Sequence, residues 1–511
     1  MGRAKTHTRT AEALQCSPFI ILTPSQAKLD PAIRKQVRSY VMRGKNRKSH
    51  SLHDKVAVGS WINGRQGLEL GQPTAADQGI PRRVGNDMTH IPFADEMKPY
   101  MQDLAFKWFT ILKNAMYPIE ACVQPSNRQW VEYLAYDRAY VHSVLFAAQG
   151  FFDYVREARF GNVTMRHLTS ALNMLRQNLL SKDLATSDST ISTVLTLTLM
   201  ADILGDTDAA RQHIQGLYQM VSLRGGIRSL GYNSELQSKV LRADLGIAIS
   251  TGSKPLFFAS GFSWDSYLAP RDAAGSSSSS HRNNISSINT PFPALTSDLR
   301  LLNTAADLQQ FSVSANLAFQ TGLKMPADAF HEILVSVQYR LLALQHEHDE
   351  ALSSLSLSSS LPSSSKHKCR GEQEKKEERQ AETLLRLGML AFTTTTFLQI
   401  QELPMRYPDL AARMRRAVND MADRGKAEGG EEMRRLELWF LFVARISVVG
   451  GVEDEEMLAR AAKEALKVLG LMGIGSGAGW REVRDVLKGY MWIDWVHSAR
   501  GLTFYMKLVE S

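Results

Sequence analysis

The sequence contains very few cysteines. Only Cys16, Cys122 and Cys369 occur among its 511 residues, and no two of them lie within a hundred residues of each other. An odd and dispersed set of this kind excludes a disulfide framework, and it excludes a structural zinc site that needs four clustered ligands. We therefore expect a reducing compartment, and neither a metal nor a cofactor.

Long apolar runs are also missing. The first thirty residues contain no apolar stretch of signal-peptide length. The longest apolar stretch, LWFLFVARISVVGG, begins at Leu438 and carries Arg445 inside it, which makes it too short and too polar to span a bilayer. The sequence predicts a soluble intracellular protein that has no membrane partner.

Motifs for catalysis are weak or missing. The sequence has no nucleophile elbow, no phosphate-binding loop and no HExxH pair. GIGSGA, residues 473–478, fits the loose dinucleotide fingerprint, and Asp494 follows at a suitable distance. However, the residues before this loop have helical rather than strand spacing, and too few residues follow Asp494 to complete a sheet. We expect no enzymatic activity.

A second weak motif, QHEHDE, begins at Gln345 and suggests metal binding. His346 and His348 are two residues apart, so they point to different faces of a helix and cannot share a metal ion. We interpret this motif as a solvated helix end.

Positive charge is concentrated near the start of a chain that is otherwise nearly balanced. The formal net charge is +8, and the stretch PAIRKQVRSYVMRGKNRK, residues 31–48, supplies nearly all of it without a single acid. Asp30 and Pro31 are typical of a helix start, and Gly44 is expected to end this short helix. The predicted nuclear-import or phosphate-contact residues are Arg34, Lys35, Arg38, Arg43, Lys45, Arg47 and Lys48.

Other readings of the basic stretch stay open. A solvated basic face without a partner is the simplest alternative, because charge runs often only increase solubility. The sequence does not distinguish nuclear import from contact with a phosphate backbone. The opening MGRAKT also fits a myristoylation pattern, but a leader of this kind needs no lipid to be explained.

Helical periodicity dominates the rest of the chain. Apolar residues recur at intervals of three and four over 97–117, 131–160, 164–181 and 192–205, and again in several stretches after residue 383. The threonine run 393–396 fits a strand as well as a helix. We therefore predict an all-α fold: a basic arm over 1–50, a flexible connector over 51–93, and a helical domain over 94–511 with disordered inserts at about 271–298 and 351–382.

The most informative stretch runs from Asp206 to Asn233. It predicts a helix over 208–224 with one apolar stripe, closed by Gly225 in a left-handed conformation. Gly216 lies in the middle of this helix and is expected to allow close approach of a neighbouring helix. For His213, a partly buried or surface position is a better explanation than a catalytic role.

These residues carry a resemblance to a known family. HIQGLYQMVSLRGGI, followed by LQSKVLRADLGIAISTGSKPLF, resembles the helical regulatory region of fungal-specific transcription factors. In that family a helix ending in Arg-Gly-Gly precedes one that carries an aspartate and then a Pro-Phe turn. FIILTPSQAK near the start and WREVRDVLKGYMWIDWVHS near the end are similar to a subset of the family. The matching positions are His213, Gly216, Leu217, Val221, Arg224, Gly225, Gly226, Asp244, Pro255 and Phe257.

The resemblance implies a nuclear, helical regulator of transcription that acts without catalysis. Better-known members also carry a binuclear zinc cluster, which three dispersed cysteines cannot form. DNA contact is then expected through the basic arm or through a partner protein, with a nuclear import receptor and transcriptional co-regulators as further partners. The alternative from another class is a cytosolic helical ligand-binding or scaffold protein with no role in transcription.

Overall fold

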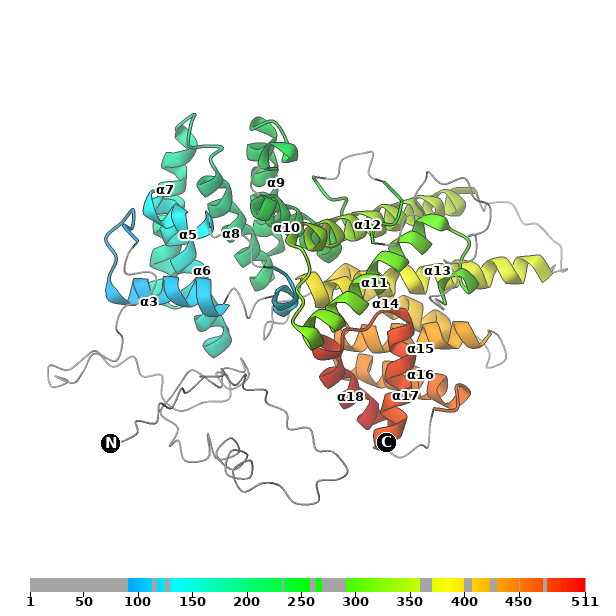
Figure 1. Cartoon of the computed structure of the whole chain (residues 1–511). Helices are drawn as coiled ribbons and strands as arrows, with labels where there is room; N and C mark the ends of the chain where they lie inside the picture. Colours follow the sequence, from blue (N-terminus) through cyan, green and yellow to red (C-terminus); the bar gives the residue numbers. More distant parts are fainter. Residues whose placement is uncertain are drawn as a thin grey trace, which may run out of the picture. The chain divides into compact units, whose positions relative to one another are not determined.

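The computed structural model confirms the all-α class (Figure 1). The described residues form helices, short 3₁₀ and π turns, and one isolated parallel bridge between Val123 and Met325. They all belong to one of the two compact units of the chain, Glu69–Ser511. The structure describes residues 91–112, 117–124, 129–231, 234–257, 263–268, 291–358, 370–398, 407–422, 430–449, 451–471 and 476–510.

The described helices run from residue 99 to residue 510. Their bounds are α3 Pro99–Lys107, α5 Gln129–Glu132, α6 Arg138–Glu157, α7 Asn162–Leu180, α8 Asp188–Leu204, α9 Thr207–Leu223, α10 Ser234–Thr251, α11 Leu299–Thr321, α12 Ala327–Ser358, α13 Arg370–Thr393, α14 Pro408–Ala422, α15 Glu431–Ile446, α16 Val452–Val468, α17 Ser476–Tyr490 and α18 Asp494–Glu510. Two π-helical turns, Trp108–Leu112 and Thr394–Leu398, directly follow α3 and α13.

Helices α3 to α9 surround the first apolar core. In Figure 1, α6, α7 and α8 lie close to one another, and α8 in turn packs on α9. The predicted helix 131–160 is interrupted before α6, because the Asp137 side chain accepts a hydrogen bond from the Tyr140 N–H and begins a new helix there. Ile91 and Phe93 pack against this core, so the end of the predicted flexible connector is part of the folded body.

Helix α10 belongs to two cores at once. Its residues Leu236, Val240 and Ala243 lie in the first core, whereas Leu245 and Ile249 lie in the second. The second core is formed by α10 to α18 and contains the fully buried indoles of Trp439 and Trp492. Because α10 is buried on nearly every side, its polar residues need partners within the protein.

The predicted disordered inserts, 271–298 and 351–382, were wrong at their edges. A 3₁₀ turn over Phe292–Ala294 buries Phe292 in the second core, and Asp298 caps α11. Helix α12 continues to Ser358, and α13 begins at Arg370. Composition averaged over each insert hid these local signals. Residues 271–290 and 359–369 lie outside the described part of the chain.

The threonine run 393–396 is helical, not a strand. Each of its hydroxyls donates to a backbone carbonyl three or four residues earlier, as Thr394 does to Ala391 and Thr396 does to Phe392. These bonds satisfy the hydroxyls inside a helix and let it enter the core. In the described part of the chain, no helix is both long enough and apolar enough to cross a membrane.

Candidate functional site

The basic segment lies outside the described residues. This holds for every residue predicted to serve nuclear import or phosphate contact, and the prediction stays a prediction. The candidate sites that the structure describes are therefore the family-like turns and the cavities. The residues of the basic segment are Arg34, Lys35, Arg38, Arg43, Lys45, Arg47 and Lys48.

The Arg-Gly-Gly stretch forms the turn that the sequence predicted. Helix α9 ends at Leu223, and Gly225 has a φ of 112°, which confirms the positive φ expected at this position. The N–H of Gly226 donates to the carbonyl of Val221, and the N–H of Gly225 donates to that of Ser222. These two bonds are those of a Schellman motif, which satisfies the last carbonyls of the helix.

Arg224 fastens this turn to the start of α8. Its guanidinium donates to the carbonyl oxygen of Thr186 at 3.0 Å and to the carboxylate of Asp188. Thr186 and Asp188 flank Ser187, which caps α8 by accepting from the Thr190 N–H. Arg224 therefore joins the end of one helix to the beginning of another, and its role is structural.

Asp244 forms the second family-like turn. Its carboxylate accepts hydrogen bonds from the N–H groups of Leu256 and Phe257, at 2.8 and 3.0 Å, and from the Tyr339 hydroxyl at 3.0 Å. Burial raises the pKa of Asp244, and these three donors oppose that effect. The aspartate holds the Pro-Phe turn around Pro255 against α12, which explains why the two motifs occur together.

The other matched positions on α9 have simpler roles. Leu217 and Val221 lie buried in the first core, as predicted from the apolar stripe. His213 is half-buried, and burial lowers its pKa. The close approach predicted at Gly216 is wrong, because a Cβ placed there would meet no atom within 4 Å. The helical pattern alone did not tell whether this face meets a neighbour.

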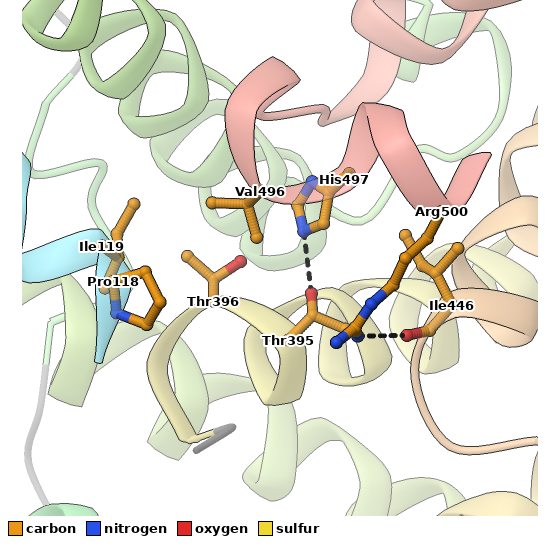
Figure 2. A pocket seen from close by; sticks show the side chains of 8 residues that line it. All are labelled: Pro118, Ile119, Thr395, Thr396, Ile446, Val496, His497 and Arg500. Atoms are coloured by element: carbon orange, nitrogen blue, oxygen red, sulfur yellow. Dashed lines mark hydrogen bonds between the residues drawn. The ribbon is translucent and has the colours of Figure 1, made fainter. Parts of the chain in front are cut away.

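A cavity of about 30 Å³ lies between the π turn after α13 and helix α18. Figure 2 shows the side chains that line it. The imidazole of His497 lies at its wall and is completely buried. The His497 Nδ1 accepts from the Ile493 N–H at 3.1 Å, so the proton of the neutral ring is on Nε2. The Nε2–H then donates to the Thr395 hydroxyl at 2.9 Å, and this hydroxyl donates to the Phe392 carbonyl.

This first cavity offers few groups to a ligand. Burial lowers the pKa of His497 to about 3, which keeps the ring neutral. The Thr396 hydroxyl donates to a carbonyl of its own helix, and the Arg500 guanidinium at the rim donates to the Ile446 carbonyl at 3.4 Å (Figure 2). Because its polar groups bond to one another, we interpret this cavity as a structural junction.

A second cavity, of about 20 Å³, lies where the two cores meet. It is lined by α8 and α10, by Leu398 of the π turn after α13, and by Tyr407. Its polar lining contrasts with that of the first cavity. Among the described residues the Asp202 carboxylate has no hydrogen-bond partner, and the buried Tyr407 hydroxyl and Arg242 Nε have none either.

The QHEHDE motif lies within α12 and not at a solvated helix end, so that interpretation was wrong. Gln345 is buried, and its amide donates to Asp349 at 2.9 Å. His346 and His348 are half-buried. Within the described ranges, no group of three or more histidines, cysteines or acids is arranged to hold a metal ion.

The GIGSGA motif is preceded by α16, which is a helix and not the strand that a dinucleotide site requires.

Sequence reasoning missed Asp202 and Tyr407. Asp202 lies near the end of the apolar helix α8, and an acid in such a setting is the available signal. Nothing in the pattern brings Tyr407 to it across two hundred residues. In comparisons with known proteins, no family model, no curated protein and no solved structure matches this chain.

Proposed function

We propose that the protein is a nuclear, non-catalytic regulator of transcription, in which a helical body carries the regulatory contacts and the basic segment 31–48 serves import or phosphate contact. The observation that carries this proposal is the pair of turns around Arg224 and Asp244. Arg224, Gly225, Gly226, Asp244, Pro255 and Phe257, which resemble the fungal regulatory region, fall on these two turns, and Leu217 and Val221 fall on the buried face of α9.

The two turns support the resemblance because their contacts account for the positions of the matched residues along the chain. Arg224 joins α9 to α8, while Asp244 joins the segment after α10 to α12. Each therefore fixes a connection between helices that are separate in sequence. Residues that matched the family only by chance would not need to make such contacts. Contacts of this kind are expected if the chain shares the helix arrangement of the family.

The basic segment supports the nuclear part of the proposal through its charge. Seven basic residues without an acid are typical of a segment that binds an import receptor, and equally of one that binds the phosphates of a nucleic acid. Co-regulators and a DNA-binding partner protein complete the proposed set of partners. The second candidate function, a cytosolic ligand-binding or scaffold protein, is favoured by the second cavity, where the Asp202 carboxylate and the Tyr407 hydroxyl have no partner among the described residues.

The test is the location of a tagged chain in a nucleated cell. Replacing Arg43, Lys45, Arg47 and Lys48 with Ala should shift the protein from nucleus to cytoplasm. A matched control removes the same charge elsewhere, at the exposed residues Arg159, Arg211, Arg228 and Lys254, and should leave the location unchanged. Exclusion of the unaltered chain from nuclei would favour the cytosolic candidate and contradict our proposal.

Phosphate contact is tested separately with purified protein and duplex DNA. If the basic segment binds the backbone, the fourfold replacement flattens the dependence of log K on log salt by up to about four counterion units. The control variant keeps the slope of the unaltered chain. Equal slopes for all three proteins would assign the segment to import alone.

A further inference from the structure

The second cavity is lined by a half-buried acid, Asp202, which no positive group among the described residues balances. Among the described residues, Asp202 makes no side-chain hydrogen bond and no ion pair, and burial raises its pKa to about 6. It lines the cavity together with Tyr117, Gly246 and Tyr407. Near neutral pH a carboxylate in this position is ionised, and an unpaired charge that is partly shielded from water is unfavourable.

Tyr407 provides a second unsatisfied group at the same place. Its side chain is almost completely buried, and its hydroxyl has no hydrogen-bond partner among the described residues. The Asp202 charge further raises the pKa of Tyr407, so the hydroxyl stays protonated. A phenol oxygen can both donate and accept, and here it can do either toward an occupant of the cavity.

Arg242 lines the cavity but does not neutralise Asp202. Its guanidinium donates to the Glu120 carboxylate at 3.0 Å and lies 4.1 Å from the centre of the Tyr117 ring. Glu120 therefore balances the charge of Arg242. Among the described lining residues, the charge that remains is the single negative charge of Asp202.

The volume and the charge of the second cavity determine which chemical group it can hold. About 20 Å³ is room for one group the size of a water molecule. Water would supply hydrogen-bond donors but no positive charge, whereas an ammonium ion has a similar size and supplies both. We propose that this cavity binds a protonated ammonium group, with the Asp202 carboxylate as counter-ion and the Tyr407 hydroxyl oxygen as a further acceptor.

The proposal is tested on the full chain by thermal unfolding at about pH 7.5. Ammonium chloride should raise Tm in a saturable manner, by about 1–3 °C beyond the effect of sodium chloride at equal ionic strength. Tetramethylammonium is too large for the cavity and should act like sodium. At about pH 5 the response should shrink, because Asp202 takes up a proton.

Variants identify the site. Asp202→Asn should fold, because it removes an unbalanced charge, and it should abolish the ammonium response. Tyr407→Phe should weaken the response several-fold. The matched control is Asp208→Asn, since the Asp208 side chain is 89% exposed and carries the same charge; this variant should respond like the unaltered chain.

Two outcomes would overturn the proposal. Equal Tm in ammonium and sodium at all concentrations would mean that the cavity holds water only. An equal ammonium response of Asp202→Asn and the unaltered chain would mean that the ammonium ion binds elsewhere. These measurements use purified protein and no cells, so their result is independent of the proposed role in transcription.

Discussion

Asp244 is a buried carboxylate on α10 and Asp202 a half-buried one on the adjacent helix α8, and their surroundings differ completely. Asp244 on α10 accepts three hydrogen bonds, two from backbone N–H groups and one from Tyr339. Asp202 on α8 accepts none from the described residues. For both, burial raises the pKa.

The comparison teaches that burial of an acid does not by itself mark a binding site. What distinguishes the two positions is whether the protein supplies the donors. Where it does, as at Asp244, the carboxylate fastens a turn and contributes to stability. At Asp202 no described residue supplies a donor, and this difference is the basis of the proposed ammonium site.

The largest effect is expected at Asp244. Asp244→Ala leaves the Leu256 and Phe257 N–H groups and the Tyr339 hydroxyl without their acceptor, and should lower the free energy of unfolding by about 2–4 kcal/mol. Urea unfolding measures this change, with the exposed Asp208→Ala as control. A loss no greater than that of the control would mean that the turn does not depend on the carboxylate.

A smaller effect, with a defined pH dependence, is expected at Asp202. The pKa of Asp202 rises from 3.8 to about 6 on folding. The contribution of this carboxyl to the free energy of unfolding is therefore complete below pH 3.8 and is lost as the pH rises through 6. Relative to Asp202→Asn, which does not titrate, the unaltered chain should lose on the order of 1–3 kcal/mol over this range. Unfolding in urea from about pH 4 to pH 8 tests it; parallel curves would contradict the desolvation of Asp202.

The smallest effects are expected from a matched pair of tyrosines. Tyr339→Phe removes the hydroxyl that donates to Asp244 and should cost about 1–2 kcal/mol. Tyr407→Phe removes a buried hydroxyl without a partner, and should leave the free energy of unfolding unchanged or raise it by up to about 1 kcal/mol. Chemical denaturation of the two variants in the absence of ammonium tests this difference in sign. Equal losses would show that both hydroxyls are bonded.

Much of the fold could be predicted from local patterns. Helix α9, its buried stripe and the positive φ of Gly225 follow from residue spacing and from the ability of glycine to adopt that backbone conformation. Predictions that depended on which helices pack against each other were less reliable. The open surroundings of Gly216 and the burial of Phe292 depend on which helices meet, and the periodicity of a single helix does not contain that information.

The sequence by itself determined the all-α class and most helix positions, because apolar spacing, caps and glycines act within a few residues of one another. Only the tertiary structure decided the difference between Asp202 and Asp244. In the sequence, the acids of α8 and α10 look alike. The donors that distinguish them come from the turn after α10 and from α12, and Tyr407 reaches Asp202 from a distant part of the chain. Long-range packing decides which buried charge is satisfied, because a hydrogen bond needs its partner within about 3 Å.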